Sequence, residues 1–398
     1  MKSFYRKALG TLTSLITLGT LFPSTIPSSS FADSDSILLG DANGDGYVTY
    51  ADATTVLEYL SGVINPDAER VTCMDINEDY VIDKTDYFKI NHLVSTGQNT
   101  VNNNPSLSSN KTLYSLPNFE GRDYYIHDCS SNNPASRVGY TLNLPNPSNQ
   151  QNRTINLRST DSSDLENLNV VRITTSSGAW GSGFLISNHI VATAAHVVFS
   201  SNSFETGVTI SIYANSEATQ ENLLKSCSAS EIHIPQDYVF ESGGTEVNYD
   251  YALIYVDSDL TQINNTNYTI SPFSLGVATN EFMDTSAALT TSGFRNVTVN
   301  NSNHIFRYYS TGQVKNMVTL FGNSLDGNDP EMRMYSEGYS ISGKSGGPVY
   351  RDTVYYSQSI RSVLGITTGA SPTTHNTWSD RITPTLLQFY YNNPYINT

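Results

Sequence analysis

Three side chains suited to nucleophilic catalysis lie in separate short fragments of the chain. His196 ends the fragment IVATAAH, Asp250 lies in NYDYALI 54 residues later, and Ser345 lies in GKSGGPV 95 residues further on. A serine hydroxyl becomes a nucleophile when a neighbouring base removes its proton, and a carboxylate can hold an imidazole base in the required tautomer. Glycines around the serine let the chain turn tightly and present backbone N–H groups to an oxyanion. The three fragments together indicate hydrolysis by a serine nucleophile.

The order and spacing of these fragments resemble those of the chymotrypsin superfamily, over about residues 165–392. By this resemblance, His196 is the general base and then the general acid, and Asp250 stabilises its imidazolium form. Ser345 is the nucleophile, and the amides of Gly343 and Ser345 form the oxyanion hole. The resemblance implies an all-β fold of two six-stranded barrels. It also implies a serine endopeptidase that cleaves protein or peptide substrates and needs no cofactor for catalysis.

Three further fragments, IHIPQDY, TTSGF and VLGI, look most like the bacterial glutamyl endopeptidase branch of that superfamily. Two positions depart from the patterns of related enzymes. The digestive enzymes have Asp before the nucleophile, where it binds a freed N-terminus, and Lys344 stands there in this chain. The glutamyl branch has His after the Gly-Ile pair, and here Thr367 offers a neutral group that binds a carboxylate less well. The sequence therefore predicts neither N-terminal activation nor a glutamate preference, and Tyr339 gives no support for a trypsin-like preference.

A second function class is compatible with the same fold. A catalytically silent protein-binding module can use a protease scaffold, although the complete set of His, Asp and glycine-flanked Ser favours the enzyme. A polysaccharide hydrolase is a third alternative. It needs two carboxyl groups facing each other across a sugar cleft, and the sequence has no distinctive signature of such a pair.

The catalytic fragments lie in a region with the pattern of a β domain. From residue 112 to residue 398, short runs of Val, Ile, Tyr and Thr are broken by Asn, Gly, Ser and Pro. This pattern is typical of many short strands, so we expect 112–398 to be the protease domain. Residues 117–160 are rich in Asn, Pro and Ser, and three interpretations stay open for them: a pro-segment, an extension, or part of the barrel.

Two Asp- and Asn-rich loops precede this domain, 34 residues apart. In each loop, oxygen-bearing side chains occupy positions 1, 3, 5, 9 and 12, and a backbone carbonyl is available at position 7. Calcium takes six or more hard oxygen ligands at flexible distances, and this spacing wraps them around one ion. The expected ligands are Asp41, Asn43, Asp45, Tyr47, Thr49 and Asp52 in the first loop and Asp75, Asn77, Asp79, Val81, Asp83 and Asp86 in the second.

The two loops differ at the bend, which is position 6. Gly46 occupies it in the first loop, and Tyr80 occupies it in the second, where a side chain strains the turn. An ordinary EF-hand pair is a rival interpretation, but EF-hands have Glu at position 12 and both loops have Asp there. Only ILL precedes the first loop, which leaves no room for an entering helix. A helix is expected to follow each loop, such as the one over 51–60.

The loops and the stretches that follow them resemble the dockerin family over residues 38–97. The resemblance implies a small α-helical domain that binds two structural Ca2+ ions and docks onto a cohesin module of a scaffold protein, as in cellulosomes. The family contacts its partner largely at loop positions 10 and 11, which are Tyr50-Ala51 and Lys84-Thr85 here. These pairs differ, so the sequence does not imply docking in two equivalent orientations.

The first 32 residues have the pattern of a secretory signal peptide. Lys2, Arg6 and Lys7 precede a modest apolar stretch, and the tripeptide SFA at the end of 1–32 offers small residues for cleavage. No segment has the length and apolarity expected of a membrane span. We therefore expect a secreted, extracellular and scaffold-bound protein, with 98–111 as a flexible linker before the protease domain.

Charge and cysteine content limit the partners and the crosslinks. The chain has 21 Lys and Arg against 37 Asp and Glu, a formal net charge of −16, which repels phosphate backbones. We therefore expect no nucleic-acid partner and no membrane partner. Three cysteines, Cys73, Cys129 and Cys227, cannot all pair within one chain. A Cys129–Cys227 bridge stays open.

Overall fold

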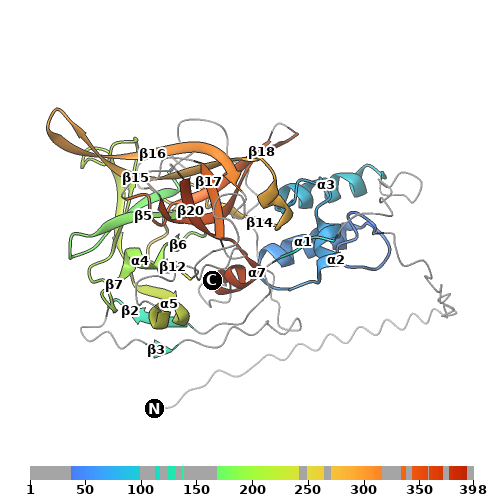
Figure 1. Cartoon of the computed structure of the whole chain (residues 1–398), viewed down its shortest axis with the longest axis horizontal. Helices are drawn as coiled ribbons and strands as arrows, with labels where there is room; N and C mark the ends of the chain where they lie inside the picture. The colour runs from blue at the N-terminus through green and yellow to red at the C-terminus, as the bar shows by residue number, and fades with distance from the viewer. Residues whose placement is uncertain are drawn as a thin grey trace, which may run out of the picture.

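The computed structural model describes most of the helical N-terminal part and most of the β-sheet part that follows. Figure 1 shows these two parts side by side. The expected signal peptide (1–32) lies outside the described residues, and so does the expected linker (98–111) except for Gln98. The described residues are 37–98, 113–116, 124–130, 137–138, 168–241, 249–263, 270–315, 333–337, 343–356, 358–370 and 376–391.

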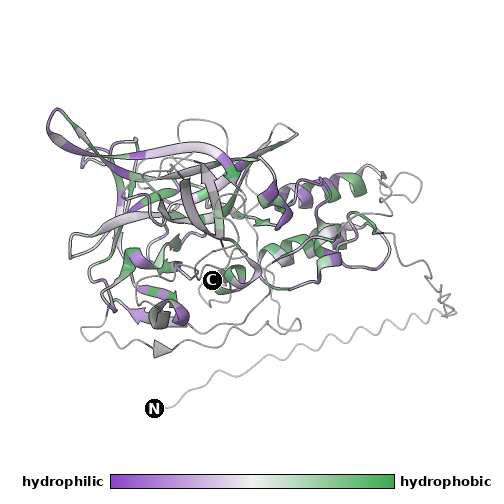
Figure 2. Cartoon of the chain, viewed as in Figure 1, coloured by the Kyte–Doolittle hydropathy of each residue, from purple (hydrophilic) through white to green (hydrophobic). Residues whose placement is uncertain are grey.

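The helical part begins each of its two longer helices with a capping box. Thr49 and Asp52 form the box that starts α1, and Asp83 and Asp86 form the box that starts α3. These side chains satisfy N–H groups that have no partner within the helix. α1 packs against α3, and Figure 2 shows both helices as mixtures of hydrophobic and hydrophilic residues, as expected of helices with one buried face. The elements are α1 (Tyr50–Leu60), α2 (Ala68–Met74), β1 (Val81–Ile82) and α3 (Lys84–Ser95).

The first sheet of the β part contains nine antiparallel strands. It is larger than the six strands expected of one barrel. Two of the additional strands come from a segment of 117–160: β2 pairs with β11 and carries β3 at the edge. This segment is therefore part of the sheet. In sheet order the strands are β10 (Leu223–Ser228), β9 (Thr209–Tyr213), β4 (Val170–Thr174), β5 (Trp180–Leu185), β6 (Ile190–Thr193), β12 (Ala252–Tyr255), β11 (Glu231–Pro235), β2 (Tyr124–Asp128) and β3 (Arg137–Val138).

The second sheet contains seven strands and closes on itself, because β19 pairs with β20 as well as with β18. Closure leaves the barrel strands without free edges. The long hairpin of β15 and β16 extends beyond the barrel at the upper left of Figure 1. In sheet order the strands are β13 (Ser274–Leu275), β19 (Gln358–Ala370), β18 (Pro348–Tyr355), β15 (Ala288–Val299), β16 (Ser302–Lys315), β17 (Arg333–Glu337) and β20 (Asn376–Arg381).

Shorter elements lie between and after the strands of the two large sheets. Within the described ranges, none of the helices is long and apolar enough to cross a membrane. Cys129 and Cys227 form no disulfide, so the open Cys129–Cys227 bridge is not formed in this structure. The shorter elements are α4 (Ala195–Val198), β7 (Phe199–Ser200), β8 (Ser203–Phe204), α5 (Gln236–Glu241), β14 (Val277–Ala278), η2 (Glu281–Asp284) and α7 (Pro384–Tyr391).

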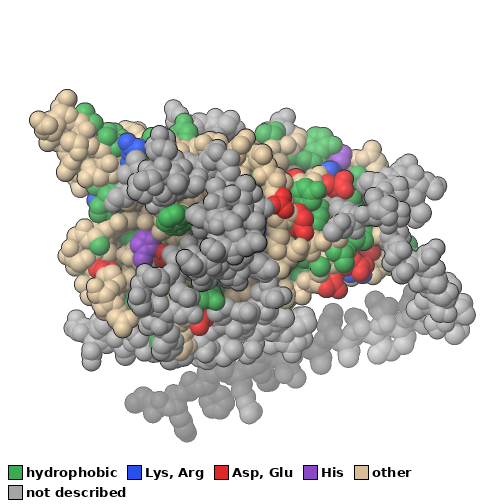
Figure 3. All heavy atoms as spheres, viewed as in Figure 1, with side chains coloured by type: hydrophobic (Ala, Val, Ile, Leu, Met, Phe, Trp, Pro, Cys, Tyr) green, Lys and Arg blue, Asp and Glu red, His purple; other side chains and the backbone are tan. Residues whose placement is uncertain are grey.

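Acidic side chains are unevenly distributed over the surface. Figure 3 shows Asp and Glu gathered on the part formed by α1, α2 and α3, while most of the visible β part carries neutral side chains. The acidic side chains therefore concentrate where the two calcium loops were expected.

Candidate functional site

The candidate catalytic base and its carboxylate lie at the ends of two neighbouring strands. β6 ends at Thr193 and leads into α4, which carries His196, while Asp250 lies just before β12. β6 and β12 are antiparallel, with Thr193 opposite Ala252. The last residue of β6 and the first residue of β12 therefore lie side by side, at the same end of the two strands. This pairing brings together two residues that are 54 positions apart.

Asp250 holds His196 at two points. Its Oδ2 lies 2.6 Å from Nδ1 of the imidazole, and its Oδ1 accepts a 2.8 Å hydrogen bond from the backbone N–H of His196. Because Nδ1 faces an acceptor, it carries the ring proton and leaves Nε2 as the free base. Burial alone would lower the pKa of His196, but the charge and the hydrogen bond of Asp250 outweigh it and raise the pKa. The pair has the arrangement of a general base oriented by a buried carboxylate.

Glycines shape the loop that carries Ser345. Gly343 has φ of 100° and Gly346 has φ of 83°, both in the left-handed region that glycine tolerates. A Cβ on Gly343 would lie 2.1 Å from the ring of Trp180, and a Cβ on Gly346 would lie 2.1 Å from Oγ1 of Thr193. Gly346 therefore lies against the end of β6, from which the chain continues directly to the candidate base.

Ser182 on β5 fixes the same loop at two points. Its N–H donates a 2.8 Å hydrogen bond to the carbonyl of Ser345, and its hydroxyl donates a 2.7 Å hydrogen bond to the carbonyl of Gly343. The hydroxyl also accepts a 2.7 Å hydrogen bond from the backbone N–H of Phe294. Ser182 has no exposed surface. One buried residue of the first sheet, through its backbone and its side chain, thus contacts both residues expected to form the oxyanion hole.

The candidate nucleophile lacks the direct hydrogen bond to the base that the carboxylate makes. Within the described part of the chain, no hydrogen bond joins the hydroxyl of Ser345 to His196. The amides of Gly343 and Ser345 likewise have no acceptor among the described residues. Catalytic hydrogen bonds without substrate are often long and tighten when substrate binds. The structure therefore brings His196 and Asp250 together and places Ser345 nearby with unengaged backbone donors.

Lys344 anchors the nucleophile loop to the hairpin of the second barrel. Its side chain has no exposed surface, and its Nζ donates hydrogen bonds to Ser310 (3.0 Å) and Thr291 (3.3 Å). The same Nζ lies 5.0 Å from the ring centre of Tyr308. Burial, with the nearby charge of Arg295, lowers the pKa of Lys344 to about 7. The residue that stands in place of an activating acid therefore packs into the protein interior.

Thr367, which stands in place of the His of the glutamyl branch, lies beside the nucleophile loop. Its N–H donates a 2.8 Å hydrogen bond to the carbonyl of Gly347, and its carbonyl accepts a 2.7 Å hydrogen bond from Gly346. The Thr367 hydroxyl is buried and has no hydrogen-bond partner within the described residues. A neutral hydroxyl at this place gives no positive charge to a substrate carboxylate. Tyr339 lies outside the described residues.

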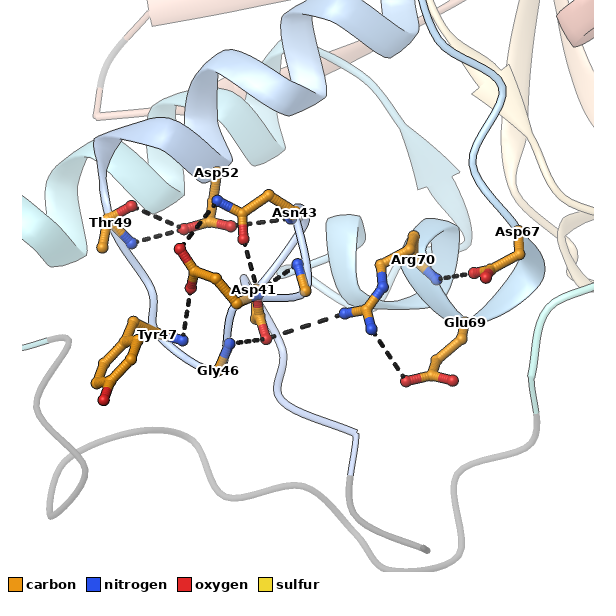
Figure 4. Close-up of polar contacts among 11 residues, drawn as sticks. Asp41, Asn43, Gly46, Tyr47, Thr49, Asp52, Asp67, Glu69 and Arg70 are labelled. Carbon is orange, nitrogen blue, oxygen red and sulfur yellow. Dashed lines mark hydrogen bonds and ion pairs between the residues drawn. The ribbon is translucent and has the colours of Figure 1, made fainter. Parts of the chain in front are cut away.

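Two carboxylates of the first calcium loop organise its backbone. Both oxygens of Asp41 accept backbone N–H groups of the loop, including that of Gly46, and Asp52 accepts those of Asn43 and Thr49. Figure 4 shows these carboxylates turned into the loop. Burial raises the pKa of Asp52, and the charge of Asp41 adds to the increase, while hydrogen bonds act in the opposite direction.

The second loop repeats these hydrogen bonds. Asp75 accepts the N–H groups of Asp79 and Tyr80, as Asp41 does in the first loop, and Asp86 accepts the N–H of Asp83. Tyr80 at the bend has φ of 65°, so a residue with a side chain takes the left-handed conformation, as expected from the sequence. Tyr114 lies beside this bend.

Tyr114 contributes to the second loop from outside the dockerin-like module. Its ring centre lies 5.4 Å from that of Tyr80, and its hydroxyl donates a 2.7 Å hydrogen bond to Asp75. Its backbone N–H donates to the hydroxyl of Thr72. Tyr80 therefore combines a left-handed backbone conformation with a ring that packs against Tyr114.

The residues of both loops fit calcium. Asp75, Asp83 and Asp86 have no exposed surface, and burial together with the other carboxylates raises the pKa of Asp86 well above its ordinary value. Buried carboxylates at such density are stabilised by protonation or by a bound cation. Within the described ranges, no group of three or more His, Cys, Asp or Glu converges as a metal centre by itself. A calcium site therefore needs the amide, hydroxyl and carbonyl oxygens of the loops as well.

Arg351 on β18 is a contributor that the sequence did not predict. Its Nη2 lies 2.9 Å from Oδ2 of Asp79 and 2.9 Å from Oδ2 of Asp83. Like Ser182 and Tyr114, it has no motif of its own, and its role depends on which elements pack together. None of the three could be found from local sequence signals.

The family model for Trypsin matches residues 157–385, which is more than half of the chain. The chain belongs to the trypsin family. The matched range contains His196, Asp250 and Ser345 together with most of both sheets. Membership of the trypsin family, with the two curled sheets, confirms the expected chymotrypsin-like fold.

The family model for the Dockerin type I domain matches residues 39–95, close to the 38–97 expected from the sequence. The three helices of this range agree with the expected small α-helical domain. Dockerin type I domains bind calcium. The trypsin-family chain therefore carries a dockerin module at its N-terminal side.

Among solved structures, a Glu endopeptidase in complex with MPD is similar to the chain at 17% identity. The similarity covers 59% of this chain and 94% of that chain, with a TM-score of 0.43. The comparison with curated proteins gave no match.

Proposed function

We propose that the chain is a secreted serine endopeptidase that its dockerin module holds on a cohesin-bearing scaffold. The observation that carries the proposal is the two-point hydrogen bonding of His196 by the buried Asp250, beside the loop of Ser345. Membership of the trypsin family supports a peptidase. The proposed division is a signal peptide (1–32), the dockerin module (38–97), a linker (98–111) and the protease domain (112–398).

In the first half of the reaction, Oγ of Ser345 attacks the carbonyl carbon of a peptide bond, and Nε2 of His196 takes the hydroxyl proton. Asp250 stabilises the imidazolium that forms, because its carboxylate lies 2.6 Å from Nδ1. The N–H groups of Gly343 and Ser345 hold the oxyanion. His196 then gives the proton to the leaving amine, the C–N bond breaks, and an acyl ester remains on Ser345.

In the second half, water attacks the ester carbonyl while His196 removes a proton from the water. The bond between the acyl carbon and Oγ of Ser345 breaks, and the serine oxygen recovers the proton from His196. The products are the carboxylic acid and the free enzyme. Ser182 keeps the carbonyls of Gly343 and Ser345 fixed during both halves, so the nearby donors need not reorient.

Calcium has a structural role in this proposal. Each loop holds one Ca2+ ion, which neutralises the clustered carboxylates and stabilises the folded module. The first ion is held by Asp41, Asn43, Asp45, Thr49, Asp52 and the carbonyl of Tyr47, and the second by Asp75, Asn77, Asp79, Asp83, Asp86 and the carbonyl of Val81.

The partners follow from the two families. The protease domain takes a protein or peptide substrate, and the neutral Thr367 beside the nucleophile loop favours substrates other than those with an acidic side chain at the cleaved bond. The dockerin module binds a cohesin outside the cell. No nucleic acid or membrane takes part. Because Lys344 replaces the acid that binds a freed N-terminus, the active chain stays uncut and tethered.

A serine-directed fluorophosphonate probe tests the proposal on the full chain. The wild type should be labelled, S345A should not, and S203A should be labelled like the wild type because Ser203 is exposed and lies on the short strand β8. A folded wild type that takes no label and cleaves no peptide library would instead be a catalytically silent binding module. Labelling that survives in S345A would place the nucleophile elsewhere.

A further inference from the structure

The second calcium loop is built into the protease domain. Its strand β1 pairs with β14 in antiparallel register, with Val81 opposite Ala278. The N–H of Thr279 donates a 2.9 Å hydrogen bond to the carbonyl of Tyr80. Val81 has no exposed surface and belongs to the same hydrophobic cluster as core residues of the second barrel. A ligand-bearing loop therefore shares a sheet and a core with the catalytic domain.

Contacts between the module and β18 extend along the strand. Arg351 bridges Asp79 and Asp83, and only 11% of its side chain is exposed. Further along the strand, Tyr355 stacks on Phe88 of α3 with ring centres 6.4 Å apart. Tyr356, just after the strand, contacts α3 as well. The dockerin module therefore holds β18 at its middle and at its end.

β18 is also the strand that carries the nucleophile loop. It begins at Pro348, three residues after Ser345, and its first residues pair with β19 beside Thr367. Val349 and Tyr350, between the loop and Arg351, are buried. A strand fixed between a barrel and a second module transmits little motion to the loop at its start. The position of Ser345 therefore depends on how firmly Arg351 is held.

Among the residues that the structure describes, none outside the dockerin module holds the first loop in this way. Its nearest arginine is Arg70 of the same module, whose Nη1 lies 3.9 Å from Asp41. Tyr47 and Tyr50, beside that loop, are 67% and 55% exposed. The contrast makes the link between a calcium loop and the catalytic strand specific to the second loop.

We propose that Ca2+ in the second loop holds the nucleophile strand in place through Asp79, Asp83 and Arg351, so that Arg351 is a positioning residue of the protease. The catalytic part of this inference rests on the proposed peptidase function, whereas the coupling between loop and strand does not. The dockerin module is then a part of the catalytic domain as well as a tether.

The coupling follows from the charges in the loop. The negative charges of Asp75, Asp79 and Asp83 act on Asp86, and Arg351 offers a single positive charge to Asp79 and Asp83. Each ionised carboxylate has about four acceptor positions, so it can bind a metal ion and a guanidinium together. Without the ion, the remaining repulsion loosens the loop, and with it the carboxylates that hold Arg351. The ion and the strand are therefore linked through shared ligands.

Hydrogen exchange measured by mass spectrometry tests the coupling without reference to catalysis. The full chain is used in the S345A background, which prevents self-cleavage, with calcium or with EGTA. EGTA should raise the exchange rate of amides in β14 and in β18 after Arg351 by about tenfold or more, because these amides open locally when the loop loosens. The additional variant R351M should show the same increase with calcium present.

R361M is the matched control. Arg361 also makes a two-point contact with a carboxylate of β18, Asp352, but lies on β19 and not at the loop. The R361M variant should show the same amide exchange rates as its S345A parent. R351K, which keeps the charge on a side chain without the fork, should fall between the two. Two results would overturn the proposal: amide exchange rates in β14 and β18 that are the same with calcium and with EGTA, or rates that are equal in R351M and R361M.

Activity separates this inference from the proposed function. In the chain with Ser345 intact, R351M should lower kcat severalfold with little change in KM, because the nucleophile loop is misplaced while the substrate contacts remain. An equal fall of kcat in R361M would overturn the positioning role. If exchange couples to calcium but the wild type cleaves nothing, the peptidase proposal fails while the calcium-linked strand stands.

Discussion

The first calcium loop borders solvent, whereas the second borders the protease domain. Their ligand spacing is the same, and their backbone hydrogen bonds match at Asp41 and Asp75. Yet Tyr47 beside the first loop is 67% exposed, while Asp83 in the second has no exposed surface. A duplicated motif can therefore keep its metal chemistry in both copies while only one of them becomes part of another domain.

The largest expected difference between the loops lies in their arginines. R351M should lower the free energy of unfolding by about 3–5 kcal/mol, because it leaves buried carboxylates without their partner. R70M should cost about 0–1 kcal/mol, because Arg70 is partly exposed and 3.9 Å from Asp41. Urea unfolding of both variants in EGTA, where no calcium ion compensates these carboxylates, measures the difference. Equal losses would mean that the two loops are equivalent.

Calcium ligands give the next effect. D86N and D52N should each lower the calcium affinity of their own loop. Only D86N should lower the melting temperature of the protease domain. An ion present at a hundred times its dissociation constant contributes about 2.7 kcal/mol, and this contribution is what D86N loses. Calorimetry with calcium and with EGTA is the measurement. A protease transition that shifts equally in D52N would remove the distinction between the loops.

The bend residues give a smaller effect. Gly46 has φ of 86° with open space around its Cα, so G46A should cost about 1–2 kcal/mol from conformation alone. Y80G should change stability by less, because relief of the strained backbone is offset by loss of the Tyr114 contact. Thermal unfolding of the two variants compares them. A gain of stability in Y80G as large as the loss in G46A would show that the Tyr114 contact contributes nothing.

The pH dependence of catalysis should be the property that the second loop changes least. Neutral His196 is the base, and its pKa is raised, so kcat/KM should rise with pH through a value above about 6.5, the ordinary value for histidine. D250N should move that rise to lower pH, because it removes the charge that favours the imidazolium, and should also lower the rate. R351M should lower kcat/KM by the same factor at every pH, so the pH at which kcat/KM rises should stay the same. A pH profile shifted in R351M would mean that Arg351 acts on the base directly.

The sequence predicted those parts of the molecule that have local motifs. The fragments around His196, Asp250 and Ser345 have characteristic neighbours, and the calcium ligands recur at fixed intervals, so these could be named in advance. The chymotrypsin-like fold followed from the resemblance and is confirmed. The helix expected over 51–60 corresponds to α1 (Tyr50–Leu60).

The remaining features depend on contacts between distant segments. Ser182 looks like any small residue in a strand until it meets Gly343, which is 161 positions away. Arg351 meets Asp83 across 268 positions. The sequence showed that Lys344 is not an acid, but not that its ammonium enters the barrel interior. Pairing of β2 with β11 also has no local signal, because nothing within the short strand β2 indicates a partner that lies about a hundred positions further along the chain.

The pairing of β2 with β11 has a consequence for a chain that is cut after β3. β2 reaches the sheet through five residue pairs, and its partner strand lies about a hundred residues further along the chain. A nick between residues 138 and 168 would leave the upstream fragment hydrogen-bonded to the barrel. Such a preparation would run as two bands on a denaturing gel and as one particle in gel filtration, with its scaffold anchor retained.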